Sequence, residues 1–279
     1  MELIDAAAAA RMMEALTALV LRAGEAILTI NRAGMRVEGK SDGSPVTEAD
    51  LAADRILTMG LRHYAPDIPM VSEEQVDSIA PLACDGSYFL VDPLDGTREF
   101  IAGRDEFTVN VAIVSAGAAV LGIIAAPALG LLWRGIPGQG AERLRISEGT
   151  VSAGEPIRCR AMPCLGDPWI AVVSRSHCDS DSDAFIRRLA GAVRHPLGSA
   201  VKFGRIAEGE ADVYPRLGPT SEWDIGAGCT IVAAAGGRVT TPSGGEIRFG
   251  AAAPGGIVPR FIVPGFIAWG DPGASHTKF

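Results

Sequence analysis

Three apolar runs that follow one another between residues 107 and 136 constrain the fold of this chain most strongly. The runs are 107-FTVNVAIVS-115, 118-AAVLGIIAAP-127 and 130-GLLWRGI-136, with very short connections between them. Apolar and β-branched runs joined by tight turns predict consecutive strands of an antiparallel meander. Segments with helical spacing lie on both sides of these runs in the sequence. We therefore expect a layered α/β fold, an α+β arrangement with mixed sheets, and not a doubly wound parallel sheet.

The first 32 residues predict an amphipathic helix, because Met12, Leu16, Val20 and Ile27 recur at helical spacing. Acidic residues near the start do not fit the basic region of a secretory signal. Charged residues inside the segment also argue against a membrane span. We therefore expect a cytoplasmic protein.

The rest of the chain divides around residues 137–168, a segment rich in glycine, proline and charge that we interpret as an excursion or a boundary. Elements predicted before it are a strand with a polar loop over 34–50, a helix over 47–63 and a short strand over 68–74. Elements predicted after it are a strand over 169–176, helices near 183–193, 199–210 and 224–235, and closing strands. We expect two α/β halves, residues 1–150 and 151–279, within one compact unit.

Charge and cysteine spacing exclude several classes of protein. The formal net charge is −8, which does not favour a nucleic-acid groove. The five cysteines are an odd number without a Cys-x-x-Cys pair, so we expect free thiols and neither disulfides nor a zinc ribbon. The glycine-rich motifs of the two common nucleotide-binding folds do not occur.

The stretch 88-YFLVDPLDGTREFIAG-103 runs from an apolar strand directly into two carboxylates, Asp92 and Asp95. Polar residues at the carboxyl end of a buried strand stand where α/β proteins usually place their sites. A turn between the acids would let both side chains and the carbonyl of Leu94 face one point, and Mg²⁺ prefers such oxygen ligands. On turn propensities alone, a solvated Asp-Pro-x-Asp-Gly turn is the competing interpretation.

Further acids in the sequence strengthen the prediction of a cation site. Glu73 and Glu74 end another candidate strand, and Asp224 opens an apparent helix. Asp224 is a favoured N-cap type and Thr47-x-x-Asp50 has the spacing of a capping box, so each acid also has a purely structural interpretation. Together they supply the carboxylates that a site for several Mg²⁺ ions needs.

Gly96 and Thr97 directly follow the second acid of the turn. A helix that begins there would point free backbone N–H groups at the site, where a phosphate oxygen can bind. Gly96 would permit a close approach of the backbone, and Thr97 adds a hydroxyl group. A helix start without a ligand is the alternative, and the sequence alone favours neither.

These motifs resemble those of the inositol monophosphatase superfamily of Mg²⁺-dependent, lithium-sensitive phosphatases, and within it the CysQ-type 3'(2'),5'-bisphosphate nucleotidases. The resemblance rests on Asp92-Pro-Leu-Asp95-Gly96-Thr97, with Glu73 upstream and Trp223-Asp224 downstream. The strings that extend it, in order along the chain, are 40-KSDGSPVTEADLAAD-54, 91-VDPLDGTREFIAGRDEFTVNVAIV-114, 173-VSRSH-177, 198-GSAVKFGRIAEGEADVYPRLGPTSEWD-224 and 266-FIAWGD-271. It implies an αβαβα sandwich whose first half binds metal and whose second half forms the substrate pocket.

The resemblance also implies a role for each residue of the motifs. The ligands of two or three Mg²⁺ ions would be Glu73, Asp92, the Leu94 carbonyl, Asp95 and Asp224. Asp50 and Thr97 would orient and deprotonate the attacking water, Glu73 would also take part in catalysis, and Glu74 would support the site through water. Phosphorus would be attacked in line, without a phosphoenzyme.

Substrate-binding residues are expected mainly in the second half of the chain. The candidates that the resemblance implies are Ser174, Arg175, His177, Ser199, Lys202, Tyr214 and Arg216, together with Asp95, Gly96, Thr97 and Asp224. Arginine and lysine suit a second phosphate that is not cleaved. For Arg175 and Arg216, a structural ion pair with an acid is the competing interpretation.

The activity that the resemblance implies is hydrolysis of adenosine 3',5'-bisphosphate (PAP) to AMP and phosphate, a reaction of sulfur metabolism, with conversion of PAPS to APS as a further activity of the same site. An inositol monophosphatase or a fructose-1,6-bisphosphatase with the same metals is the alternative. A non-catalytic metal or nucleotide sensor is more remote, because the catalytic and ligand side chains of the motifs are all present. The partner would be a small phosphorylated nucleotide and not a nucleic-acid polymer. A monomer or a homodimer, and a peripheral association with the inner membrane, are left open.

The chain departs from the family pattern at two places. After Trp223-Asp224 the family commonly has Thr-Ala-Ala-Gly-His, whereas here the run is Ile225 to Cys229 with two glycines. Gly204 stands where a cysteine is common in the CysQ-type branch. Neither change removes a catalytic group, but both affect the expected shape of the pocket.

Overall fold

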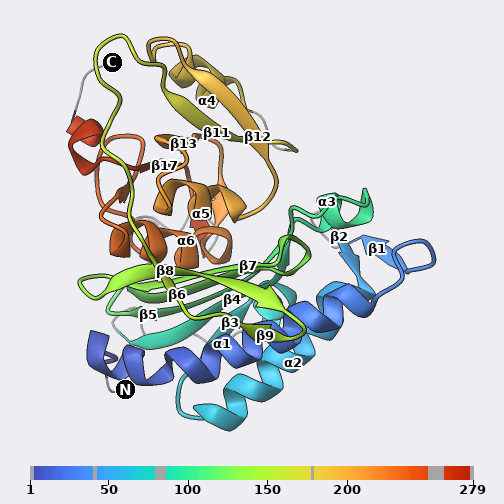
Figure 1. Cartoon of the computed structure of the whole chain (residues 1–279). Coiled ribbons are helices and arrows are strands. Elements are labelled where there is room, and N and C mark those ends of the chain that lie inside the picture. The colour runs from blue at the N-terminus through green and yellow to red at the C-terminus, as the bar shows by residue number, and fades with distance from the viewer. Residues whose placement is uncertain (1–2, 40–42, 79–85, 177–178, 251–260, 277–279) are drawn as a thin grey trace.

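The computed structural model describes residues 3–39, 43–78, 86–176, 179–250 and 261–276. Helices and sheets alternate through the molecule as layers, with one large sheet near the N-terminal helices and a smaller sheet beyond it (Figure 1). The predicted αβαβα sandwich with mixed sheets is therefore confirmed. In the described parts of the chain, no helix combines the length and the apolar character that crossing a bilayer requires.

Within the described residues, the first sheet has eight strands and contains the predicted meander. Its strands are β3 (Met70–Ser72), β4 (Ser87–Asp95), β5 (Thr108–Ser115), β6 (Ala118–Ala126), β7 (Leu131–Ile136), β8 (Gly140–Ser147), β9 (Thr150–Val151) and β10 (Glu155–Ile157). Their order is β10-β8-β7-β6-β5-β4-β3, and β9 pairs with β8 outside this path. β3 is parallel to β4, while β4 to β8 are antiparallel to their neighbours, so the sheet is mixed.

The second sheet, in the part of the chain that the structure describes, has five strands in the order β12-β11-β13-β17-β15. They are β11 (Ile170–Ser174), β12 (Val193–Leu197), β13 (Val213–Arg216), β15 (Arg238–Thr240) and β17 (Phe266–Trp269). β11 is parallel to both β12 and β13, and β17 is antiparallel to β13 and β15. Two short pairs lie outside the sheets: β1 (Val37–Gly39) with β2 (Pro45–Thr47), and β14 (Thr220–Ser221) with β16 (Ile262–Val263).

Helices cover the faces of both sheets. α1 (Ala6–Thr29) and α2 (Glu48–Tyr64) pack on one face of the first sheet, as their amphipathic spacing predicts. α5 (Val201–Ala207) and α6 (Glu222–Ala234) fill the layer between the two sheets. α4 (Ser180–Ile186) contacts β13 of the second sheet. Shorter helical segments are α3 (Thr97–Ile101), η1 (Glu73–Ser78), η2 (Pro127–Leu129) and η3 (Pro272–His276).

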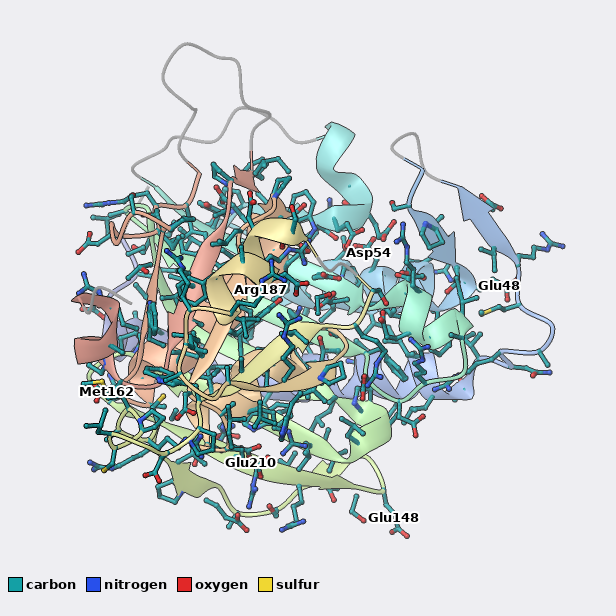
Figure 2. All side chains as sticks on the ribbon, turned by 90° about the horizontal axis from the view of Figure 1, so that it is seen from above. Glu48, Asp54, Glu148, Met162, Arg187 and Glu210 are labelled. Atoms are coloured by element: carbon teal, nitrogen blue, oxygen red, sulfur yellow. The ribbon has the colours of Figure 1, made fainter. Side chains whose placement is uncertain are left out.

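α2 shows how the sequence sets a helix start and a buried face at once. Thr47 is the N-cap and forms a capping box with Asp50, as its spacing predicts. Asp54, one turn further on, is also buried, whereas Glu48 is exposed. Figure 2 shows Asp54 well inside the outline of the molecule and Glu48 near its edge. The helix therefore turns two carboxylates inward, toward the end of β4 and β3.

Two predictions from the sequence are corrected by the structure. Residues 137–168 do not form a simple excursion, because β8 to β10 lie within them and extend the first sheet. Near the edge of a sheet a strand is half exposed, so its charges conceal the strand pattern. The helix predicted near 183–193 begins at Ser180, capped by Asp179, and ends at Ile186. Its predicted C-terminal part is a turn that contains Gly191 with a φ of 62°, followed by β12.

Glycines explain how α6 fits between the sheets. A Cβ atom on Gly228 would lie 2.3 Å from the ring of Phe203, and one on Gly226 would lie 2.7 Å from a methyl group of Leu90. A Cβ atom on Gly204 would lie 2.5 Å from the Trp133 ring. At positions 204 and 226, where the chain departs from the family pattern, the absence of a side chain leaves room for a large side chain of a neighbouring element. The close packing offsets the free-energy cost of glycine within a helix.

Candidate active site

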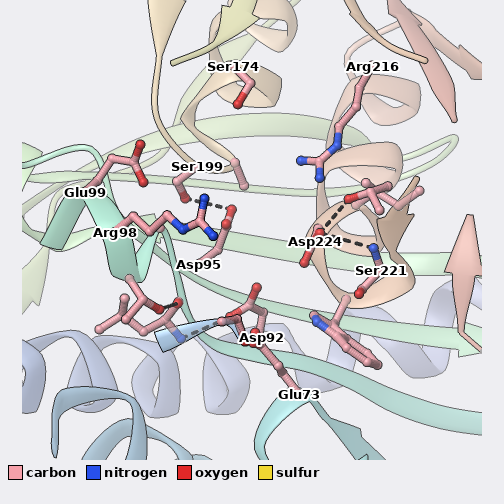
Figure 3. A pocket seen from close by; sticks show the side chains of 18 of the residues that line it. Glu73, Asp92, Asp95, Arg98, Glu99, Ser174, Ser199, Arg216, Ser221 and Asp224 are labelled. Carbon is pink, nitrogen blue, oxygen red and sulfur yellow. Dashed lines mark hydrogen bonds between the residues drawn. The ribbon is translucent and has the colours of Figure 1, made fainter. Parts of the chain in front are cut away.

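A cavity of about 850 Å³ lies between the first sheet and the C-terminal elements. The predicted site residues that line it are Glu73, Glu74, Asp92, Leu94, Asp95, Gly96, Thr97, Ser174, Ser199, Lys202, Tyr214, Arg216 and Asp224. Figure 3 shows the acids Glu73, Asp92 and Asp95 on one side, with Ser174 and Arg216 across from them and Asp224 facing Asp95. The fold thus brings residues from distant parts of the sequence around one space.

The end of β4 holds the first group of acids. The pairing of β4 with β5 shifts register between Asp92 and Asp95, so the strand bulges where the acids occur. Asp92 is 1% exposed, and its Oδ1 accepts a hydrogen bond of 3.1 Å from the backbone N–H of Leu94. The Leu94 carbonyl oxygen also lies 3.2 Å from the Thr97 hydroxyl oxygen, whose single hydrogen has a closer acceptor in Asp50. The turn between the acids is therefore fixed by a hydrogen bond of its own.

Thr97 and Asp50 are joined directly, although 47 positions separate them. The Thr97 hydroxyl donates a hydrogen bond of 2.8 Å to Asp50 Oδ1. Asp50 Oδ2 accepts hydrogen bonds from the backbone N–H of Thr47 at 2.8 Å and from the Thr47 hydroxyl at 2.6 Å. Burial raises the pKa of the Asp50 carboxyl group, and the hydrogen bonds from Thr47 and Thr97 counteract only part of this effect. Gly96, with a φ of 92°, begins α3 at this point, as predicted.

Glu73 and Glu74 follow β3 and are placed by a buried network that sequence reasoning missed. Asp54 accepts hydrogen bonds from Ser72 Oγ at 2.6 Å and from Gln75 Nε2 at 2.7 Å. These two donors lie on either side of the glutamates in the chain, so Asp54 fixes the turn that carries both. The available signal was the spacing of Asp50 and Asp54, one helical turn apart on the same face of α2.

Asp224 lies in the first turn of α6. Ser221, and not Asp224, is the N-cap, because Asp224 is the third helical residue and closes a capping box with Ser221. The structural interpretation of Asp224 as an N-cap is therefore wrong in detail. Its Oδ2 accepts hydrogen bonds from the Ser221 N–H at 3.2 Å and from the Thr220 hydroxyl at 2.5 Å. Burial, and then the negative charge of Asp95, raise the pKa of Asp224 to about 6.

The donor set of the cavity fits a divalent cation. It consists of carboxylates and one backbone carbonyl, the hard oxygen donors that Mg²⁺ prefers. The effect of Asp95 on the pKa of Asp224 shows that like charges repel across the cavity, as expected where a cation is to be held. In the described residues, no three acidic, histidine or cysteine side chains gather closely enough around one point to hold an ion. The acids therefore share a cavity without meeting at a single position.

Two cationic side chains of the second half of the chain, Lys202 and Arg216, line the cavity. Lys202 is 3% exposed, and its ammonium group donates hydrogen bonds to the carbonyls of Leu197, at 3.3 Å, and of Ser199. It also lies 5.1 Å from the centre of the Tyr214 ring. Burial lowers the pKa of Lys202 to about 8, although the charge of Asp95 acts against this. Arg216 lines the same wall and donates a hydrogen bond of 3.2 Å to the Pro219 carbonyl.

Ser199 connects the two walls. Its hydroxyl donates a hydrogen bond of 2.8 Å to Asp95 Oδ2 and lies 2.5 Å from the hydroxyl of Thr108 on β5. Its backbone has a φ of 53°, a region that residues other than glycine seldom adopt. Such strain is typical of functional sites. The contact with Asp95 was not anticipated, because the sequence analysis considered Ser199 only as a substrate ligand.

Among the described residues, one predicted substrate residue does not line the cavity. Arg175 does not line it and pairs with Glu106, with an N–O distance of 2.8 Å, while also donating to the Pro196 carbonyl. This is the structural ion pair that the sequence left open, and a role of Arg175 in substrate binding stays a prediction. His177 lies outside the described residues. Arg98 and Glu99 do line the cavity but were missed, although they belong to the same short motif as Thr97.

Known proteins similar to this chain point to one family. The sequence model of the inositol monophosphatase family matches residues 8–268. The protein named 3'(2'),5'-bisphosphate nucleotidase CysQ of Shigella flexneri is 36% identical over 261 residues, covering 91% of this chain and 98% of that protein. The protein of the same name in Salmonella typhimurium is 37% identical over 259 residues, with the same coverage. The crystal structure of CysQ from Bacteroides thetaiotaomicron has a TM-score of 0.73 and 30% identity, and covers 94% of this chain and 97% of that one.

Proposed function

Because this chain belongs to the inositol monophosphatase family, as its motifs predict, we propose that it is a metal-dependent phosphatase that hydrolyses adenosine 3',5'-bisphosphate to AMP and phosphate. The CysQ relatives, named bisphosphate nucleotidases, support the substrate class. The observation that carries the proposal is that one cavity is lined both by carboxylates and by the cationic side chains of Arg98, Lys202 and Arg216. A bisphosphate substrate needs both kinds of group, because the carboxylates would hold the metal ions at the phosphate that is cleaved and the cationic side chains would hold the phosphate that is kept.

The cleaved phosphate would bind on the acidic side. The groups that would hold two or three Mg²⁺ ions are the side chains of Glu73, Asp92, Asp95 and Asp224 and the carbonyl of Leu94. Mg²⁺ bound there supplies positive charge that neutralises the phosphate and lowers the pKa of water. Glu74 lies beside Glu73 on the cavity wall and supports this group. The backbone at Gly96 and Thr97, where α3 begins, faces the same space.

Thr97 and Asp50 would direct the attacking water. The Thr97 hydroxyl hydrogen is already donated to Asp50, so its oxygen is left to accept a hydrogen bond from water. The water proton would pass to the Thr97 oxygen while the Thr97 proton passes to Asp50. The water oxygen would attack phosphorus as the bond to the 3'-oxygen breaks, and the 3'-oxygen would take a proton from solvent to become the hydroxyl group of AMP. Glu73, which lines the same cavity, would also take part in this step, as the motifs imply. The raised pKa of Asp50 suits a group that receives a proton.

The retained 5'-phosphate would bind on the basic side of the cavity. Lys202 has its ammonium group fixed by two backbone carbonyls and by the face of Tyr214, so its position is set before a ligand arrives. Arg216 offers a planar fork of donors, which suits phosphate oxygens. Ser174 completes this wall. A 5'-phosphosulfate would meet the same groups, so PAPS is expected as a second, related substrate.

The experiment that tests this proposal compares phosphate release from adenosine 3',5'-bisphosphate, inositol 1-phosphate and fructose 1,6-bisphosphate, each with Mg²⁺ and with EDTA. We expect Mg²⁺-dependent release that is fastest for the nucleotide. Preference for either sugar phosphate would overturn the assignment of Lys202 and Arg216 while leaving the acidic wall in its role. Absence of release from all three substrates would favour a metal or nucleotide sensor.

A further inference from the structure

β5 carries two buried polar side chains directly beneath the acids of the cavity. Its odd-numbered residues from Val109 to Ile113 pack in the core with α1 and α2, and Ala112 and Val114 pack on the opposite side, toward α6. Alternation along a strand places Thr108 and Asn110 on that same side. Their exposed fractions are 0% and 1%. The face is thus apolar along most of its length and polar only where it approaches the cavity.

The register of the sheet pairs each of these polar residues with an acid. Thr108 is opposite Asp95, and Asn110 is opposite Asp92. Residues directly opposite each other in an antiparallel pair have their Cβ atoms about 4.5–5.5 Å apart on the same face. On its other side Asn110 is opposite Ile124, an apolar residue of β6. Of the two residues paired with Asn110 on the neighbouring strands, Asp92 is polar and Ile124 is apolar.

Thr108 and Asn110 differ in how their polar atoms are satisfied. The Thr108 hydroxyl is within hydrogen-bond distance of Ser199, which donates to Asp95. In the described structure, neither the amide nitrogen nor the amide oxygen of Asn110 has a hydrogen-bond partner. Burying an amide group without hydrogen-bond partners costs free energy. We therefore expect the amide to form a hydrogen bond in another state of the protein. The amide torsion of asparagine is soft, so a small rotation is enough to meet a partner.

We propose that Asn110 is a positioning residue for the cation site, and that its amide N–H group donates a hydrogen bond to the Asp92 carboxylate when a divalent cation is bound. Carboxylates that bind metal ions are usually fixed by a further hydrogen bond, and loss of that bond commonly weakens metal affinity. Asn110 would thereby do for Asp92 what Ser199 does for Asp95. The inference rests on the proposed function only in taking Asp92 as a cation ligand. It requires no contact between Asn110 and the substrate.

A matched pair of variants separates positioning from packing. Asn110→Thr and Asn110→Val place side chains of almost the same shape in the strand, but only threonine keeps a donor. Mg²⁺ affinity is measured by calorimetry on the substrate-free protein, and the melting temperature is measured with EDTA and with Mg²⁺. We expect Asn110→Val to bind Mg²⁺ about tenfold or more weakly than the wild type, with Asn110→Thr between them. With EDTA, Asn110→Val should melt no lower than Asn110→Thr, since it leaves no unsatisfied polar atom.

Ile124→Leu is the control, because Ile124 is the apolar neighbour of Asn110 on the same face, and its Mg²⁺ affinity should equal that of the wild type. Equal Mg²⁺ affinities of Asn110→Val and Asn110→Thr would overturn the inference and leave the proposed function standing. The inference would also be overturned if the two variants differed only in melting temperature with EDTA. A wild-type protein that binds no Mg²⁺, or binds it as tightly after Asp92→Asn, would overturn both.

Discussion

The two walls of the cavity are built in different ways. On the acidic wall, Asp92, Leu94 and Asp95 lie on one turn, which a hydrogen bond within it fixes. The basic wall takes Lys202 from α5 and Tyr214 from β13, two elements that come together only in the folded chain. Three of the groups suited to any phosphate ester are therefore contiguous in the chain, and Glu73 of η1 and Asp224 of α6 join them in the folded molecule. The groups suited to choosing one ester all come from separate elements. Substitutions on the two walls should have different kinetic effects.

The largest effect is expected on the acidic wall. Asp92→Asn removes a negative charge that would hold the cation, so turnover of adenosine 3',5'-bisphosphate should fall by about a thousandfold or more, because cation catalysis contributes several kcal/mol. Steady-state kinetics at saturating Mg²⁺ measures this loss. Asp67→Asn, at an exposed position outside the cavity, is the matched control and should leave turnover unchanged. Undiminished, Mg²⁺-dependent turnover by Asp92→Asn would contradict the assignment.

A smaller loss of turnover is expected where the acidic wall handles protons. Thr97→Val keeps the shape of the side chain but removes the hydroxyl that donates to Asp50. Turnover should fall by about 10²- to 10³-fold, in the range of general acid–base catalysis, with little change in KM. Thr97→Ser keeps the hydroxyl and should recover most of the rate. If the Thr97→Val and Thr97→Ser variants lower turnover equally, the Thr97 hydroxyl has no part in the reaction.

The basic wall should affect KM more than turnover. Lys202→Met removes the ammonium group proposed to hold the 5'-phosphate, so KM for adenosine 3',5'-bisphosphate should rise about 10- to 100-fold. Adenosine 3'-monophosphate, which has no 5'-phosphate, should show a much smaller change. Arg205→Met, on the same helix but paired with Glu208 and outside the cavity lining, is the control. An equal rise in KM for both substrates would show that Lys202 only supports the fold.

The pH dependence of Mg²⁺ binding should report Asp224. Its pKa is raised to about 6, so between pH 7 and pH 5 a proton competes with the cation and Mg²⁺ affinity should fall about tenfold. Because the pKa is raised, this group stabilises the metal-free protein at low pH, and that stabilisation is lost as pH rises through about 6. The gain in melting temperature on adding Mg²⁺ should therefore be larger at pH 7.5 than at pH 5. The Asp224→Asn variant should lose this difference; if it keeps it, another group is responsible.

The smallest effect is expected at Arg175, which the sequence associates with the substrate and the structure associates with Glu106. Arg175→Gln breaks a partly exposed ion pair, so stability should fall by no more than about 1 kcal/mol. KM for the bisphosphate should stay within about threefold of the wild type, since the side chain does not line the cavity. A large rise in KM for the bisphosphate alone would restore Arg175 to the substrate pocket.

The same contrast between contiguous and dispersed groups decided how far the sequence could predict the molecule. The meander and the capping box at Thr47 were predictable, because short-range spacing encodes both. β8 was not, since a partly exposed strand with several charged residues lacks a clear apolar alternation. Within the site, the placement of Thr97 beside Asp50 was predictable only through the family resemblance.

Other contacts of the site depend on which helix face meets which strand end. Asp54, on the helix before β3, supports the turn of Glu73 from 18 positions before Ser72, and Ser199 reaches Asp95 across 104 positions. No local pattern encodes such a pair, because each partner has an adequate local explanation of its own. Glu99 is a different case: it belongs to the recognised motif, but a charged residue on a short helix gives no sign that it will be 4% exposed.

The contact between Gly226 and Leu90 has a consequence for how this chain can diverge from its relatives. An added methyl group on the helix would lie 2.7 Å from the leucine side chain, so helix and strand divide a fixed volume between them. A relative that gains a carbon atom at the helix position must turn the leucine side chain aside, lose a carbon at the strand position, or shift the helix that carries Asp224. We therefore expect the two positions to covary, with the distance between the acidic groups as the quantity that selection preserves.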